Sequence, residues 1–193
     1  FSNEKIYTSW FLTPSSSRLS SLITNSIIDG KIIFVDNDIT LDGTIKTVPI
    51  LNIIGNGSII NNPNKYIVNG NIRIENVKFD NFSAISDNIF LNTNNYSQRE
   101  FTIYLKNIEF DGKKICDRFY NHNIGTGTDY TILTELVITG CTFKNTRSYG
   151  FRHTGEITCG VISDNIFTDI GISTEQTTRS IAIQLGTNSE TCI

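Results

Sequence analysis

Two arginines in similar short stretches are the residues of this sequence best suited to bind an anion. Arg118 lies in the strand candidate DRFYN at 117–121, and Arg152 lies in the strand candidate GFRH at 150–153. Alternate side chains of a strand point to opposite faces, so a strand that buries Phe119 turns Arg118 and Tyr120 outward. Guanidinium groups bind carboxylates through charge-assisted hydrogen bonds, and a tyrosine ring beside them can pack on a sugar. We therefore predict a site for an acidic or hydroxyl-rich sugar formed by Arg118, Tyr120, Arg152 and His153.

Two acids near these stretches are candidates for catalysis. Glu156 follows the strand candidate that holds Arg152, and Glu175 lies in the segment before the next strand candidate. Carboxylates about 5 to 5.5 Å apart suit a retaining glycosidase, and a gap of roughly 6.5 to 9.5 Å leaves room for the water of an inverting one. A lyase would instead combine one base with an arginine that neutralises a uronate. Glu156 and Glu175 are therefore our predicted catalytic pair, for hydrolysis or for elimination.

The same residues also allow a simpler interpretation. Outward arginines are often only solvated, and the two histidines, His122 and His153, can equally be polar surface residues. This interpretation assigns no chemistry to the stretches and stays open at this point.

The segments that must position these side chains repeat along the chain. A ten-residue phrase occurs four times, as IRIENVKFDN at 72–81, IYLKNIEFDG at 103–112, LVITGCTFKN at 136–145 and GVISDNIFTD at 160–169. Apolar residues stand two apart on either side of an Asn, Gly or Asp, which indicates two strands joined by a sharp corner. The corner residues tolerate left-handed backbone. They are Asn76, Asn107, Gly140 and Asp164.

The phenylalanines set the repeat length. Phe79, Phe110, Phe143 and Phe167 stand 31, 33 and 24 residues apart. Periods of this length mark stacked repeats, and the alternating pattern makes them strands, so we predict a parallel β-helix. Each turn of it, here called a coil, needs a third strand, for which the candidates are 85–91, 117–121, 150–153 and 181–185. The longer intervals imply extra loops at 92–100 and 122–134.

The phrase of strand, corner and strand resembles the pectate-lyase-like superfamily of right-handed parallel β-helices over residues 30–193, and most of all the tail spikes of bacteriophages. The resemblance implies a capsule depolymerase, hydrolase or lyase, that acts on a cell-surface polysaccharide without a cofactor. It also implies a homotrimer located on the virion tail or outside the cell. The sequence lacks the adjacent Asp-Asp, the Gly-His-Gly and the Arg-Ile-Lys of polygalacturonases, which argues against pectin hydrolysis.

Two other functions fit the same repeat. One is a non-catalytic β-helix that serves as the structural shaft of a virion or an adhesin. The other is a secreted bacterial enzyme of the pectate-lyase-like kind. A fold alone does not choose among these functions.

Composition excludes several classes of partner. The net charge is −3 and no basic run occurs, so the positive patch that nucleic-acid binding needs is missing. No segment is apolar enough for membrane insertion.

The four cysteines, Cys116, Cys141, Cys159 and Cys192, match no zinc spacing. Because Cys141 shares an inward column with Val77 and Ile108, we expect free, mostly buried thiols, with two disulfides as the alternative.

The first thirty residues differ from the rest. Ser15 to Ser17 offer capping hydroxyls, a helical apolar face follows, and Asp29-Gly30 ends the pattern. We predict an amphipathic helix that covers the open end of the β-helix, with Trp10 and Phe11 packed on that end. The expected domains are 1–30, the N-terminal segment and capping helix, and 31–193, the β-helix. The chain contains no Met, and we expect the β-helix to continue beyond residue 193.

Overall fold

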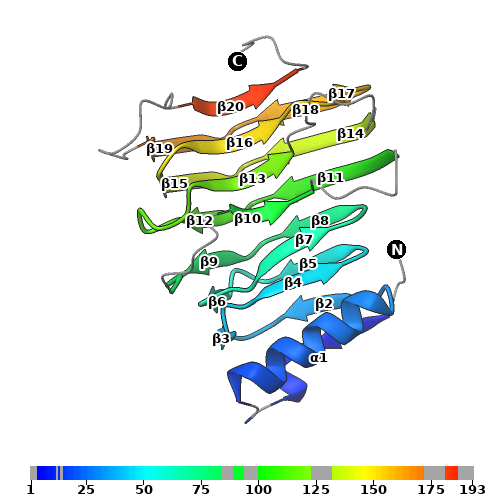
Figure 1. Cartoon of the computed structure of the whole chain (residues 1–193). Coiled ribbons are helices and arrows are strands. Elements are labelled where there is room, and N and C mark those ends of the chain that lie inside the picture. The colour runs from blue at the N-terminus through cyan, green and yellow to red at the C-terminus, as the bar shows by residue number, and fades with distance from the viewer. Residues whose placement is uncertain are drawn as a thin grey trace.

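The chain forms a right-handed parallel β-helix with one helix at its N-terminal end (Figure 1). The structure, a computed structural model, describes residues 4–11, 13, 15–83, 89–93, 100–122, 132–171 and 181–186. Three parallel sheets run along the stack, and successive coils add strands to each of them. The predicted fold class is therefore confirmed.

The first sheet, sheet A, holds the first strand of each repeated phrase. Its members pair through residues of the same column, as Ile72 with Ile103 and Ile74 with Leu105. All four of these side chains are buried. Sheet A consists of β1 (Lys5–Tyr7), β2 (Ile32–Val35), β5 (Leu51–Gly55), β8 (Ile72–Glu75), β11 (Glu100–Lys106), β14 (Ile132–Thr139), β17 (Glu156–Ile157) and β18 (Gly160–Ser163).

The second sheet, sheet B, carries the phenylalanine column. Phe110 pairs with Phe79 below it and with Phe143 above it, and Phe143 pairs with Phe167. The predicted register is confirmed. Sheet B consists of β3 (Ile39–Thr40), β6 (Ile59–Asn61), β9 (Lys78–Asp80), β12 (Glu109–Asp111), β15 (Thr142–Thr146) and β19 (Ile166–Ile170).

The corner between sheets A and B is built as the sequence predicts. All four corner residues have left-handed backbone, with φ of 52° at Asn76, 51° at Asn107, 65° at Gly140 and 57° at Asp164. The side chain of Asn107 donates a hydrogen bond from Nδ2 to Oδ1 of Asn76, over 3.0 Å. The corner therefore repeats both the backbone conformation and, between these two coils, the side-chain contact.

A second left-handed column closes sheet B, and the sequence analysis did not identify it. It contains Asn81, Asn145 and Asp169, with φ of 53°, 56° and 53°. These residues end three of the four phrases. The last residue of these three phrases was thus the signal for the second corner.

The third sheet, sheet C, contains the predicted third strands. The candidates correspond to β10, β13, β16 and β20, although residues 85–88 of the first one lie outside the described residues. Most of both predicted loops also lies outside them. Sheet C consists of β4 (Ile45–Val48), β7 (Lys65–Val68), β10 (Ile89–Asn92), β13 (Arg118–His122), β16 (Tyr149–His153) and β20 (Ile181–Leu185).

The helix α1 (Ser16–Ile28) lies across the N-terminal end of the stack, as predicted (Figure 1). The hydroxyl of Ser15 caps it by accepting a hydrogen bond from the backbone N–H of Arg18. Leu19, Ile23 and Ile27 are buried and belong to the core. No helix in the described part of the chain is long and apolar enough to cross a membrane.

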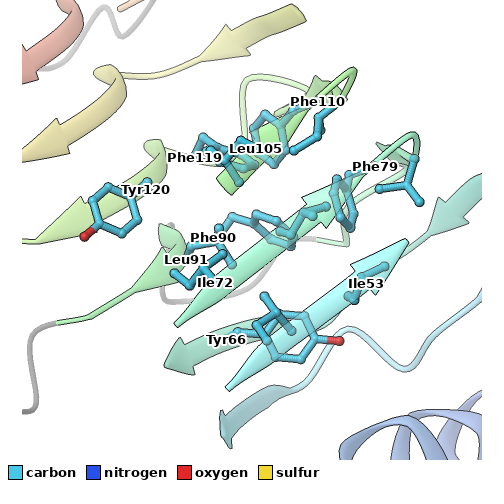
Figure 2. Packing of buried hydrophobic residues seen from close by; sticks show 14 of the residues in the cluster. Ile53, Tyr66, Ile72, Phe79, Phe90, Leu91, Leu105, Phe110, Phe119 and Tyr120 are labelled. Atoms are coloured by element: carbon cyan, nitrogen blue, oxygen red, sulfur yellow. The ribbon is translucent and has the colours of Figure 1, made fainter. Parts of the chain in front are cut away.

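The interior of the stack is a single apolar core. Figure 2 shows aromatic rings from sheets B and C meeting inside it, among them Phe79, Phe90, Phe110 and Phe119. Ring centres lie 4.8 Å apart for Phe79 and Phe90 and 4.9 Å apart for Phe110 and Phe119. This close packing of large rings fixes the relative position of the two sheets.

Two of the cysteines belong to this interior. Cys116 and Cys141 are buried and free, and Cys159 is free but exposed. Val77 and Ile108, the predicted column partners of Cys141, are buried as well. The prediction of free thiols is confirmed for these three, and Cys192 lies outside the described residues.

Candidate functional site

Arg118 and Arg152 come together on the outward face of sheet C. Pairing of β13 with β16 places Arg118 beside Tyr149 and Asn121 beside Arg152. The guanidinium carbon lies 4.9 Å from the centre of the Tyr149 ring for Arg118 and 5.5 Å for Arg152. Two arginines therefore flank a tyrosine ring, but the ring is not that of Tyr120. The ring belongs to Tyr149, which the sequence analysis missed.

Tyr120, the ring we had predicted, is buried, so its outward orientation was wrong. Phe119 and Tyr120 both point inward, which breaks the alternation of β13. Phe119 packs on Phe143 of sheet B at 4.8 Å, and Tyr120 stacks on Phe151 of sheet C at 4.3 Å. Phe119 thus fills the angle between two sheets, where the rule of alternation within one flat strand no longer holds.

His153 is also buried, which corrects its assignment to the binding face. Its Nδ1 lies 3.2 Å from the hydroxyl of Tyr120, and the His122 ring stacks on it at 4.7 Å. Nδ1 of His122 lies 3.1 Å from Oγ1 of Thr93. Both histidines therefore belong to a buried polar cluster inside the stack rather than to the surface.

Burial keeps both histidines neutral at pH 7. It lowers the pKa of His122 to about 4. For His153, burial and then the neighbouring charge of His122 lower the pKa to about 3. A neutral imidazole in an apolar interior avoids the cost of a buried charge. These groups stabilise the coil and cannot reach a ligand on the outward face.

Arg118 is held in place by its neighbours. Its Nη1 donates a hydrogen bond to Oδ1 of Asn121 over 2.6 Å, and its Nε donates to Oγ of Ser148 over 3.4 Å. Asn121 and Ser148 are both buried. Burial, followed by the charge of Arg152, lowers the pKa of Arg118. The side chain is therefore a fixed cation next to a second cation.

Arg152 is placed differently. Its Nε is buried and has no hydrogen-bond partner in the described part of the chain, and the same holds for Oε1 of Gln184, the residue paired with it in β20. An unpaired buried donor costs free energy, and an anion close to the guanidinium group offsets that cost through its charge. Arg152 is thus the less well satisfied of the two arginines on this face.

The surrounding sheet offers these cations no counterion. The six described strands of sheet C contain no Asp or Glu, and the acidic residues of the sheets lie in strands of A and B. Asp117, just before β13, pairs with Arg147 at 3.4 Å. Neither Arg118 nor Arg152 forms an ion pair with a described residue. The face is therefore locally positive although the chain is acidic.

The structure places Glu156, one member of the predicted catalytic pair, away from this face. Glu156 is exposed and is the first residue of β17. It pairs with Ile132 of β14, in sheet A. The chain turns out of sheet C directly after His153, so Glu156 leaves the face that carries Arg152. Glu175 lies outside the described residues. Among the described residues, the site therefore contains groups for binding an anion and no pair of carboxylates.

Tyr149 stands one residue before the strand candidate 150–153, so the sequence analysis left it out. The observed pairing of β13 with β16 sets it beside Arg118. No group of three or more His, Cys, Asp or Glu residues that could hold a metal occurs within the described ranges.

Comparison of the chain with protein-family models, with curated proteins and with solved structures found no match.

Proposed function

We propose that the outward face of sheet C binds an anionic polysaccharide through Arg118, Tyr149 and Arg152. The observation that carries the proposal is the pair of arginines over one tyrosine ring, in a sheet whose described strands contain no carboxylate. Like charges at close range repel, and an anion between them removes that repulsion while it accepts charge-assisted hydrogen bonds. A uronate carboxylate or another acidic sugar substituent supplies such an anion.

A polymer suits this face better than a small anion. Strands of a stack repeat about every 4.8 Å, so the face offers similar positions at regular intervals along the axis. In the column that contains Arg152, Asn92 and Gln184 are partly exposed, whereas Asn121 is buried. Amide side chains bind sugar hydroxyls by hydrogen bonds, so Asn92 and Gln184 support a glycan chain that runs along the stack.

The resemblance to phage tail spikes gives this binding a setting. We propose a receptor-binding or capsule-degrading β-helix that recognises a cell-surface polysaccharide as a homotrimer, on a virion tail or outside the cell. Cleavage of the bound glycan is a separate part of the proposal and does not rest on the arginine site. Of its two candidate acids, Glu156 lies in sheet A and Glu175 is outside the described residues. The alternatives are a structural shaft without a ligand and a secreted pectate-lyase-like enzyme.

Calorimetric titration with capsular and O-antigen polysaccharides, charged and neutral, tests the binding. We expect an acidic glycan to bind, and Arg152→Ala to weaken it by about 1 to 3 kcal/mol, the range for a hydrogen bond to a charged group. Arg73→Ala is the matched control, since Arg73 lies in sheet A and pairs with Glu75. Equal damage by both substitutions would mean that only bulk charge matters. Reducing ends or ultraviolet absorbance of unsaturated uronate in the same samples would report cleavage.

A further inference from the structure

The only tryptophan of the chain is presented to solvent at the N-terminal end. Trp10 ends the short helix η1 (Thr8–Trp10) and is 62% exposed. We had expected it to pack on the end of the stack. Its neighbour Phe11 does pack, partly buried, against the core. Burial of an indole ring is among the largest apolar contributions that one side chain can make to stability, and the exposed Trp10 does not make most of it.

The turn that carries Trp10 is fixed by hydrogen bonds. The backbone N–H and the hydroxyl of Ser9 donate to the carboxylate of Asp36, over 2.9 and 2.5 Å. Oγ1 of Thr8 lies 2.9 Å from Oδ1 of Asp36 and 2.6 Å from Oδ1 of Asn37. Trp10 is therefore exposed because a well-anchored turn holds it there, rather than because the chain is loose at this point.

Three rings meet at this place. The ring centre of Tyr7 lies 5.1 Å from that of Trp10 and 5.2 Å from that of Phe34. Pairing of β1 with β2 sets Tyr7 beside Phe34, and Nζ of Lys5 lies 5.2 Å from the Phe34 ring centre. Tyr7 and Phe34 are only half-buried. We name the rings of Tyr7, Trp10 and Phe34 the aromatic platform.

Polar groups surround the aromatic platform. Lys5 is exposed beside Phe34. Ser9 stands in the chain between Thr8, which is buried, and Trp10, which is exposed. A separate hollow of about 200 Å³, lined by Thr8, Phe11 and Asn37 among others, opens near the same turn, and none of the three rings lines it. The ammonium group of Lys5 and the polar turn at Thr8 and Ser9 therefore border the rings.

We infer that the aromatic platform binds the apolar face of a sugar ring, with Trp10 as the stacking surface. A pyranose has one face of C–H groups about the size of an aromatic ring and a rim of hydroxyls, which matches rings bordered by polar groups. A protein partner fits poorly, because one aromatic side chain buries about 150 to 250 Å² and a stable interface needs about 800 Å² per partner. This site lies in another sheet and in earlier coils than the arginine site.

Trp10 supplies its own signal for the test. Because the chain has one tryptophan, its fluorescence reports this site alone. The probes are N-acetylglucosamine and the methyl β-glycosides of glucose and galactose, which carry no charge. We expect a saturable change of emission with at least one of them, and protection of Trp10 from iodide quenching. Calorimetry should then find binding of that sugar at least 10-fold weaker for Trp10→Ala, with a partial loss for Trp10→Phe.

Two control variants separate this site from other effects. Ile28→Ala removes another exposed apolar side chain, 54% exposed in α1, and should leave sugar binding unchanged. Arg152→Ala should leave the fluorescence response unchanged, so failure of the arginine site and failure of the platform are distinguishable. The absence of a saturable change with every sugar would overturn the inference. An emission shift caused by protein dilution alone would also overturn it, because Trp10 would then contact a second copy of the chain.

Discussion

Arg118 and Arg152 lie over the same Tyr149 ring, yet among the described residues only Arg118 finds hydrogen-bond acceptors for its guanidinium group. Arg118 donates to the buried Asn121, whereas Nε of Arg152 has no acceptor among the described residues. The first arginine therefore contributes to the stability of sheet C, and the second is the one that we propose to act chiefly in binding.

The two substitutions should separate in an unfolding experiment. Arg118→Ala leaves Oδ1 of the buried Asn121 without its donor, so we expect a loss of about 1 to 3 kcal/mol in the free energy of unfolding. Arg152→Ala breaks no hydrogen bond that the described residues show, and should cost under about 0.5 kcal/mol. Urea titration followed by circular dichroism measures both. Equal losses for the two variants would contradict the assigned roles.

The phenylalanine column predicts one large loss of stability. Phe110 is fully buried and pairs with Phe79 and Phe143 in neighbouring coils. Removing its ring leaves a cavity that these neighbours cannot fill, so Phe110→Ala should cost roughly 3 to 5 kcal/mol. Thermal unfolding measures the change, with the exposed Ile28→Ala as control. An unchanged midpoint would mean that the column does not form the core.

The buried histidines predict an acid-sensitive stability. The pKa falls from 6.5 to about 4 for His122 and to about 3 for His153 on folding. The unfolded chain therefore binds more protons below pH 6.5, so the stabilisation is complete above that pH and is lost as the pH falls toward the folded values. Between pH 6.5 and 5 we expect a loss of about 1 to 2 kcal/mol per histidine.

Urea midpoints at pH 7, 6 and 5 test this dependence. Carboxylates contribute little in that window, because their unfolded pKa values lie near 4. Replacement of His122 and His153 by glutamine should flatten the curve, whatever its effect on the midpoint at pH 7. A midpoint that stays constant from pH 7 to pH 5 in the unaltered chain would show that the histidines are not buried as described.

The cysteines should react in two classes. Cys159 is exposed, while Cys116 and Cys141 are buried, and burial raises the pKa of the Cys141 thiol. In a Cys192→Ser variant, which removes the one cysteine outside the described residues, an aromatic disulfide reagent should modify one thiol in the native protein. Denaturation without reductant should expose three. Fewer than three in the denatured state would indicate a disulfide.

Local sequence determined most of the fold. The coils repeat one local pattern. Alternating apolar side chains fix the inward face of each strand, and each corner needs a residue that tolerates left-handed backbone. Phe79, Phe110 and Phe143 could be aligned from spacing alone, and Asn76 and Asn107 marked the corner. The helix could likewise be located, since Ser15 and Gly30 cap it by contacts within a few residues.

The site depended on distances between coils, which the sequence did not determine. Loop lengths differ from coil to coil, so only the observed register set Arg118 beside Tyr149 and placed Glu156 in sheet A. Tyr120 turned inward because Phe119 fills the angle between two sheets, a position that alternation within one strand cannot predict. Trp10 stayed outside because Asp36 and Asn37, more than 25 residues away in the chain, anchor its turn. Composition and spacing thus determined the β-helix, while contacts between distant residues decided which side chains a ligand can reach.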